Sequence, residues 1–209
     1  MKILIVDDHA IFRDGLKRIL SEEFEAATFG EAGNATEALD QIWKQKWDLI
    51  LLDIAMHGRT GLDVLKEIRS SGSGIPVLIL SAHPEEQYAV RVLKAGAAGY
   101  LTKESASREL CDAVRKLLNG GKYISANVAE RLATEIQSRG NDPHEALSNR
   151  EYQVMLLIAA GKVPKEIGQE LSLSTKTIST YRSRILEKLK LRNNAEIMRY
   201  VMDRKLAAL

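Results

Sequence analysis

The sequence predicts two domains: an α/β domain built on a doubly wound, five-stranded parallel sheet, and a smaller all-α domain. Two observations indicate this division. Short runs of Val, Ile and Leu alternate with segments of helical periodicity over the first 120 residues. A polar stretch then interrupts the apolar pattern, and the sequence after Ser148 is typical of helices joined by short turns.

The apolar runs are expected to be strands because uninterrupted runs of this kind are typical of parallel strands buried on both faces. The expected strands are residues 3–6, 26–32, 49–52, 77–80 and 98–101, of which 26–32 is the weakest. The expected helices between and after them are residues 10–22, 35–45, 60–70, 85–95 and 105–119. The order is therefore strand then helix, repeated five times.

The segment between the two domains has its own signals. Ser125 can cap a further helix. The apolar face of that helix consists of Val128, Leu132 and Ile136. Residues 138–146 are polar, contain glycine and proline, and have no apolar side chains to bury against a core, so we expect a linker there. Beyond it, Ser148 and Glu151 have capping-box spacing, and Leu147 with Tyr152 forms a hydrophobic staple.

Polar residues follow four of the expected strands at the point where each ends. They are Asp7 with Asp8, Asp53, Ser81, and Thr102 with Lys103. Because the carboxyl ends of parallel strands meet at one edge of the sheet, these side chains should converge. Carboxylates in such a cluster repel one another unless a cation lies among them, and oxygen ligands beside a phosphate favour Mg²⁺. The sequence therefore predicts a phosphoryl-transfer site.

An aspartate can be a covalent nucleophile towards phosphorus, and Asp53 is the candidate because it stands alone at the end of the middle run. The expected metal ligands are Asp8 with help from Asp7, Asp53 and the backbone carbonyl of Ala55. Lys103 can pair with the transferred phosphoryl group, and the Ser81 hydroxyl can donate to one of its oxygens. Nearby loop histidines are expected to be solvated; they are His9, His57 and His83.

At these positions the sequence resembles the receiver domain of two-component response regulators, over about residues 1–120. The matching residues are Asp7, Asp8, Asp53, Ser81 with Ala82, Tyr100 and Lys103. The resemblance implies phosphorylation of Asp53 by the phosphohistidine of a sensor histidine kinase, dependence on Mg²⁺, and a switch formed by Ser81 and Tyr100. His57 stands where the family often has proline.

The second domain contains a helix-turn-helix. Pro164 begins a helix that extends to about Leu171, and Ser174 caps a longer helix. The apolar stripe of the longer helix consists of Ile178, Ile185, Leu186 and Leu189. The opposite, polar face consists of Lys176, Thr180, Ser183, Arg184 and Glu187.

The second domain is also basic. Residues 148–209 hold 12 Lys and Arg against 6 Asp and Glu, a net charge of +6, whereas residues 1–147 hold 18 against 22, a net charge of −4. Positive side chains surround the longer helix: Lys165, Lys176, Arg182, Arg184, Lys188, Lys190 and Arg192. This arrangement is suited to the phosphates on either side of a DNA major groove, so we expect double-stranded DNA as a partner.

We expect the same helix to contact the DNA bases. Ser179, Thr180 and Ser183 are short enough to let the backbone approach base edges, and Arg184 can reach a guanine. Tyr181 can either hydrogen-bond a phosphate or lean into the core of the domain.

Over about residues 147–207 the sequence resembles the LuxR-type DNA-binding domain of NarL/FixJ regulators. The matching residues are Leu147, Ser148, Arg150, Glu151, Ala160, Gly161, Lys165, Glu166, Ile167, Leu171, Leu173, Ser174, Lys176, Thr177, Ile178, Lys188 and Leu189. The resemblance implies a four-helix domain, with helix 175–189 in the major groove and helix 194–206 available for dimerisation. It also implies DNA backbone contacts by Arg182 and Arg184. Val163 stands where the family often has a Ser or Thr cap.

Composition excludes several other classes of protein. The single cysteine, Cys111, has no partner for a disulfide, so a reducing compartment is expected. No stretch has membrane-spanning length, and the start of the chain has no signal-peptide apolar region. We therefore expect a cytoplasmic protein without membrane contact.

Together these signals predict a DNA-binding response regulator, with a receiver domain at 1–120, a linker helix and flexible linker at 121–146, and a helix-turn-helix domain at 147–209. Phosphorylation of Asp53 should promote homodimerisation and binding to an operator with two half-sites. The protein should act as an enzyme only on itself, by accepting a phosphoryl group and hydrolysing it.

Two alternatives remain open. A phosphatase or phosphotransferase of the haloacid-dehalogenase type needs a second carboxylate two residues after the nucleophile, but Ala55 occupies that place. A DNA binder that does not depend on phosphorylation would be expected to lose some of the acidic residues or Lys103, and none is lost.

Overall fold

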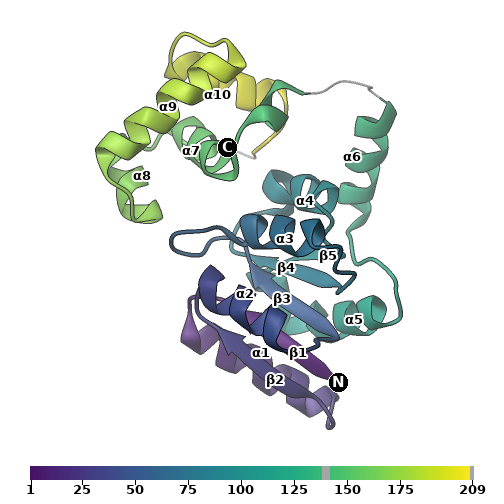
Figure 1. Ribbon diagram of the computed structural model, residues 1–209. Coiled ribbons are helices and arrows are strands. Elements are labelled where there is room, and N and C mark those ends of the chain that lie inside the picture. Colours follow the sequence, from purple (N-terminus) through teal and green to yellow (C-terminus); the bar gives the residue numbers. More distant parts are fainter. Residues whose placement is uncertain (138–141, 208–209) are drawn as a thin grey trace. The chain divides into compact units, whose positions relative to one another are not determined.

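The structure is a computed structural model that describes residues 1–137 and 142–207 (Figure 1). The chain divides into two compact units, Met1–Leu132 and Ala133–Leu209, and each is considered by itself.

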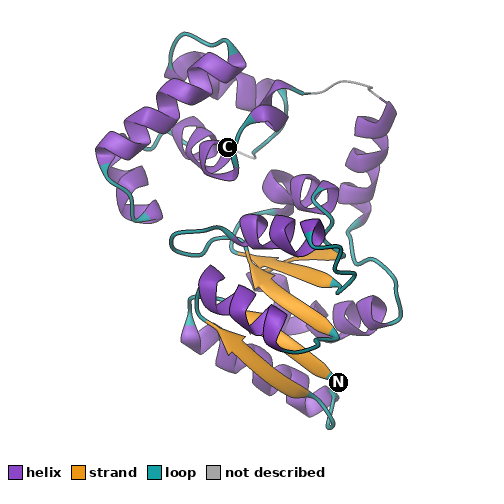
Figure 2. Cartoon of the chain, viewed as in Figure 1, coloured by secondary structure: helices purple, strands orange, loops and turns teal. Residues whose placement is uncertain are grey.

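A five-stranded parallel sheet forms the centre of the first unit (Figure 2). Its strands are β1 (Lys2–Val6), β2 (Thr28–Ala32), β3 (Leu49–Asp53), β4 (Val77–Ser81) and β5 (Gly99–Thr102). Their order across the sheet is β2-β1-β3-β4-β5. The chain therefore winds first in one direction and then in the other from β1, as in doubly wound folds. This confirms the predicted fold class, and all five expected strands are present.

Helices cover both faces of the sheet (Figures 1 and 2). They are α1 (Ala10–Glu23), α2 (Ala35–Lys44), α3 (Gly61–Ser70), α4 (Glu85–Lys94) and α5 (Lys103–Leu118), and α6 (Ala126–Gln137) follows. Leu16 and Leu20 of α1 and Leu110 and Val114 of α5 pack with β-strand side chains in one apolar core. Helices α2, α3 and α4 lie on the opposite face.

Helix α5 begins earlier than the sequence predicted, at Lys103. The reason is an N-cap: the Thr102 side chain accepts a hydrogen bond from the backbone N–H of Ser105. The last residue of β5 is thus also the cap of α5, and Lys103 lies in the first turn of a helix.

The second unit is helical. Its elements are a 3-10 turn, η1 (Pro143–Ala146), and the helices α7 (Asn149–Ala159), α8 (Pro164–Leu171), α9 (Thr175–Leu189) and α10 (Asn194–Asp203). Helix α7 contacts α8, α9 and α10. Because it is surrounded, even its polar residues Asn149, Glu151 and Gln153 are buried. The predicted capping box between Ser148 and Glu151 is present.

The predicted linker differs from the structure in its second part. Residues 138–141 lie outside the described residues. Residues 142–146, however, pack on the helical unit through η1, which contacts α9. The His144 ring nitrogen Nδ1 lies 3.1 Å from the Tyr200 hydroxyl, and Asp142 pairs with Arg204. These partners come from α10 and the residue after it, so local sequence gave no sign of them.

Candidate functional site

The functional residues of the first unit meet at the carboxyl edge of the sheet. Asp53, the last residue of β3, pairs in register with Leu80 of β4, and Ser81 pairs with Thr102 of β5. Asp7 and Asp8 directly follow β1, the neighbour of β3 on the other side. Parallel register alone therefore brings these side chains together, as the sequence predicted.

Asp53 lies at the floor of the site and is only 1% exposed. Its Oδ1 accepts a hydrogen bond of 3.0 Å from the backbone N–H of Ala55, and its Oδ2 accepts one of 2.9 Å from Lys103 Nζ. Burial raises the pKa of the Asp53 carboxyl; the ammonium of Lys103 opposes this shift, and the negative charge of Asp7 adds to it. The carboxylate is thus poorly hydrated and held by two donors.

Lys103 joins two of the three aspartates. Its Nζ lies 2.6 Å from Asp7 Oδ2 and 2.9 Å from Asp53 Oδ2, and it also lies over the Phe12 ring, 4.7 Å from the ring centre. Burial disfavours the ammonium, but the charges of Asp53 and Asp7 outweigh burial and raise the pKa of Lys103 above its usual value. The lysine therefore stays charged beside Asp53.

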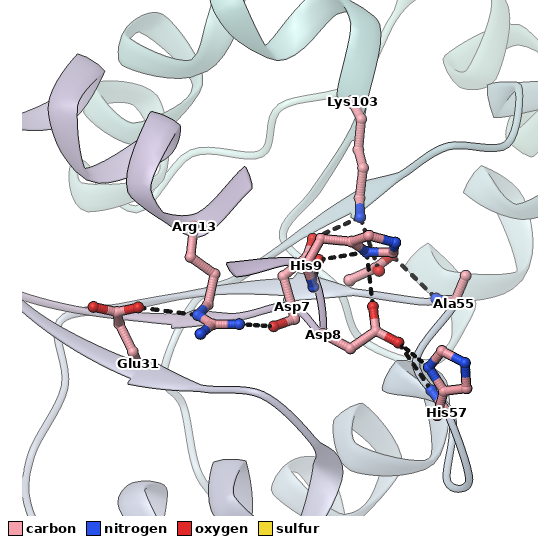
Figure 3. A network of polar contacts seen from close by, with 9 residues as sticks. Asp7, Asp8, His9, Arg13, Glu31, Ala55, His57 and Lys103 are labelled. Carbon is pink, nitrogen blue, oxygen red and sulfur yellow. Dashed lines mark hydrogen bonds and ion pairs between the residues drawn. The ribbon is translucent and has the colours of Figure 1, made fainter. Parts of the chain in front are cut away.

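Asp8 is held by two histidines, His57 and His9, whose rings were expected to be solvated (Figure 3). The His57 backbone N–H donates to Asp8 Oδ2 at 3.2 Å, and the His57 ring nitrogen Nδ1 lies 2.5 Å from the same oxygen. The His9 ring nitrogen lies 2.8 Å from Asp8 Oδ1 and 3.1 Å from Asp7 Oδ1. Burial opposes ionisation of Asp8, but the bonds from His57 outweigh it and lower the pKa of Asp8.

Both rings are about two-thirds exposed, so the expectation of solvated rings was correct in part. What sequence reasoning missed is their contact with the carboxylates. Position was the available signal, since His9 directly follows the aspartate pair and His57 stands four residues after Asp53. Arg13 was also missed: it donates to the Asp7 backbone carbonyl at 2.6 Å and pairs with Glu31 (Figure 3).

The chemistry of this cluster fits a divalent cation. Ligand atoms of Asp7, Asp8, His9 and Asp53 all lie within 4.8 Å of one another. Two buried oxygens, Asp7 Oδ2 and Asp8 Oδ1, accept no hydrogen bond, although Lys103 and the His9 ring lie at ion-pair distance from them. Carboxylate oxygens gathered in this way are the ligands that Mg²⁺ prefers.

Ser81 and Tyr100 lie beside this site. Ser81 is fully buried, and its Oγ accepts a hydrogen bond of 3.1 Å from the backbone N–H of His83. Tyr100 is buried, and its hydroxyl donates to the His83 carbonyl at 2.8 Å. Burial raises the pKa of Tyr100 above its usual range, so the hydroxyl remains a donor. Both predicted switch residues, at the end of β4 and in β5, thus bond to His83 in the loop between β4 and α4.

In the second unit, α8 and α9 form the predicted helix-turn-helix. The turn contains Ser172 in a left-handed conformation, with φ of 53°, and the Ser174 side chain caps α9 by accepting from the Thr177 N–H. Ile178, Ile185 and Leu189 of α9 are buried, as expected. The exposed residues of α8 and α9 include Lys165, Lys176, Ser179, Thr180, Ser183 and Arg184.

Three residues that the sequence predicted as DNA contacts are partly buried or have partners within the domain. Tyr181 and Arg182 are half-buried, and Arg182 Nε donates to the Asn194 side chain at 2.6 Å. Lys188 Nζ lies 2.6 Å from Glu151 Oε2 and donates to the Ala146 carbonyl at 3.2 Å. Because the Glu151 side chain is only 3% exposed, Lys188 neutralises a buried charge inside the domain. The geometry therefore supports a structural role for Lys188.

Among the described residues, no helix combines the length and apolar character that crossing a membrane requires.

Comparison with known proteins covers both units. Residues 3–115 match the family model of the response regulator receiver domain, and residues 145–201 match that of the bacterial regulatory proteins of the luxR family. The chain is 34% identical over 199 residues to Response regulator UvrY of Escherichia coli (strain K12), a match that covers 94% of this chain and 91% of UvrY. It is 33% identical to Oxygen regulatory protein NreC of Staphylococcus carnosus, with 99% of each chain covered.

Solved structures are similar over nearly the whole chain. One is RcsB from Salmonella enterica serovar Typhimurium bound to promoter rprA, with a TM-score of 0.60, 26% identity, and 97% of this chain and 98% of that chain covered. Another contains two RcsB dimers bound to two parallel DNAs, also with a TM-score of 0.60 and 26% identity.

Proposed function

Because this chain belongs to the two-component response regulators with a receiver domain and a LuxR-type DNA-binding domain, we propose that phosphorylation of Asp53 controls its binding to DNA. The single observation that carries this proposal is the buried Asp53 carboxylate, with Lys103 bonded to it and two further aspartates beside it. The phosphoryl donor is the phosphohistidine of a sensor histidine kinase, the partner of this family.

In the reaction, an Asp53 oxygen forms a bond to phosphorus while the bond from phosphorus to the kinase histidine nitrogen breaks and the imidazole leaves. Burial lowers the cost of bringing the Asp53 carboxylate to the reacting atom, because little water must be removed from it. Lys103 is already charged and lies where it can pair with the incoming phosphoryl oxygens. The Ser81 hydroxyl then donates to one of those oxygens.

We propose Mg²⁺ as the ion of the acidic cluster, with Asp7, Asp8, Asp53 and the Ala55 carbonyl as ligands. The ion supplies charge neutralisation for the phosphoryl oxygens. The ligand atoms of these aspartates, which lie within 4.8 Å of one another, support this assignment. His57 and His9 hold the Asp8 and Asp7 side chains at the mouth of the site, so they position these ligands.

The output is DNA binding by α9. We propose that Lys165, Lys176, Arg182, Arg184 and Tyr181 contact the DNA backbone or a guanine, and that Ser179, Thr180 and Ser183 approach base edges. Lys188 is not among these contacts because its charge is paired with Glu151 within the domain. The domain limits proposed are a receiver at 1–120, a linker at 121–146 whose last residues pack on the second domain through η1, and the DNA-binding domain at 147–209.

RcsB is bound to DNA as dimers in a similar structure, and this supports a phosphorylation-dependent homodimer of the present chain on an operator with two half-sites. Since its target is chromosomal DNA, we place the protein in the cytoplasm. Its only chemistry is the transfer of a phosphoryl group to Asp53 and its hydrolysis. An external phosphatase activity is disfavoured because Ala55 provides no general acid.

Phosphoryl incorporation tests the proposal directly. The full chain is incubated with Mg²⁺ and acetyl phosphate, and the acid-labile adduct is located by mass spectrometry. Asp53→Asn should abolish the adduct, whereas Asp40→Asn, a change at an exposed aspartate of α2, should leave it intact. Label that persists in Asp53→Asn would assign the phosphoryl group to another residue.

DNA binding is tested separately by selecting bound sequences from random DNA, with and without phosphorylation. Arg184→Ala should weaken binding to the selected site by roughly tenfold, as expected for loss of one good base or phosphate contact. Arg18→Ala, at an exposed arginine of α1, is the control. An unchanged affinity for Arg184→Ala at all salt concentrations would mean that this face of α9 does not meet DNA.

A further inference from the structure

Arg13, in the first turn of α1, extends from the helix to the end of β1 (Figure 3). Its side chain is only 16% exposed. Nη1 donates to the Asp7 backbone carbonyl at 2.6 Å, and Nε donates to Glu31 Oε2 at 3.0 Å. The planar guanidinium therefore makes two directed bonds at once, which the single ammonium of a lysine cannot reproduce.

The carbonyl that Arg13 holds belongs to the peptide between Asp7 and Asp8, the two aspartates that follow β1. The peptide before it is fixed by the sheet, because the Asp7 N–H donates to the Ala32 carbonyl of β2 at 3.1 Å. Strand β1 ends at Val6, and Arg13 supplies the bond to the next carbonyl. Because a peptide is planar, a fixed carbonyl also fixes the direction in which the chain continues into Asp8.

Glu31 holds Arg13 in place and offsets its charge. It lies in β2 and also pairs with Lys17 of α1. The bonds from Lys17 and Arg13 keep the pKa of Glu31 below its ordinary value, so this carboxylate is ionised at neutral pH. An unpaired guanidinium beside a cation site would repel the ion. The pair can therefore orient the aspartates with little of that repulsion.

We propose that Arg13 is a positioning residue for the divalent cation of the receiver, and that it acts through the peptide between Asp7 and Asp8 without touching the ion. This inference rests on the proposed Mg²⁺ site. Loss of an outer residue that orients metal ligands typically weakens metal binding by about 10- to 100-fold. The direction of the effect is diagnostic, because removal of a positive charge would by itself tighten the binding of a cation.

Titration of the full chain with Mg²⁺ tests this role, with the Kd measured by ¹H–¹⁵N NMR at the amides of the acidic cluster. Arg13→Met should raise the Kd by about tenfold. Arg13→Lys keeps the charge but not both bonds, so it should still raise the Kd by about threefold or more. The same spectra show whether each variant is folded.

A matched pair provides the controls. Arg18 and Glu22 form an exposed Arg–Glu pair on the same helix. Arg18→Met and Glu22→Gln should therefore leave the Kd for Mg²⁺ unchanged, whereas Glu31→Gln should raise it by about threefold, because Arg13 loses both its anchor and its counter-charge.

Labelling by acetyl phosphate gives a second readout. The Mg²⁺ concentration that gives half of the maximal labelling rate should rise in Arg13→Met by the same factor as the Kd. If Arg13→Met binds Mg²⁺ as well as Arg18→Met does, or more tightly, the inference is overturned and the proposed function stands. A wild-type Kd in Arg13→Lys would also overturn it, because charge alone would then suffice. If the wild-type chain binds no Mg²⁺, or forms no adduct on Asp53, the proposed function fails instead.

Discussion

Replacing Lys188 by methionine should destabilise the helical unit without harming DNA recognition directly. Removing one partner of a buried charge pair costs about 3–5 kcal/mol. Here Lys188 is 38% exposed, and the Ser148 N–H still donates to Glu151 at 2.7 Å, so water and backbone compensate part of the loss. We therefore expect Lys188→Met to lower the free energy of unfolding by about 2 kcal/mol, which for a domain of this size is a fall in Tm of roughly 8 to 16 °C.

Two optical signals together distinguish the unfolding of one unit from that of the other in the full chain. Both tryptophans of the sequence, Trp43 and Trp47, lie in the receiver, so tryptophan fluorescence follows that unit alone, whereas far-UV circular dichroism follows both. Lys188→Met should shift only a circular dichroism transition. The control Lys165→Met, at an exposed residue of α8, should weaken DNA binding and shift neither signal. If Lys188→Met instead weakens DNA binding with both transitions in place, Lys188 is a DNA contact and the reasoning is refuted.

Three further expectations concern other parts of the chain. Val163→Thr should stabilise the helical unit by about 1 kcal/mol, because the new hydroxyl can cap α8 where valine makes no side-chain cap; an unchanged circular dichroism midpoint would contradict this. Gly61→Ala should lower both the receiver's fluorescence midpoint and the yield of adduct, because the added Cβ would lie 1.9 Å from the Asp53 carbonyl oxygen; normal labelling would show that the backbone relaxes. Burial opposes ionisation of Glu151, but its bonds from Lys188 and Ser148 together outweigh burial and lower its pKa below 4.5. The stability that this lowered pKa contributes is therefore present above pH 4.5 and is lost as pH falls further. Lys188→Met should flatten that dependence of stability on pH.

Much of the fold could be predicted because its signals are local. The strand runs, the capping box at Ser148 and the apolar stripe through Ile178 and Ile185 each depend on residues a few positions apart. The meeting of Asp53 with Lys103 could also be predicted although 50 residues separate them, because parallel strands end at a common edge. The family resemblances at both ends of the chain are confirmed by the comparisons.

The contacts that escaped prediction depend on where loops and helices lie in space. No periodicity indicates that His57, in a loop after β3, meets Asp8, or that Lys188 meets Glu151 across 37 residues. The parallel backbone bridge that Tyr123 makes with β5 is a single residue long, too short for any strand pattern. Such pairings follow from tertiary packing and not from the spacing of residue types.

The bridge at Tyr123 also bears on how copies of this protein can associate. An open sheet offers unpaired backbone groups along its outer strands, and these can recruit a strand from another molecule. At the start of β5 the Ala98 carbonyl and the Tyr100 N–H are already bonded to the backbone of Tyr123, in the chain's own continuation. A second copy could extend the sheet there only after displacing this segment. The segment therefore protects the receiver against aggregation through its edge strand.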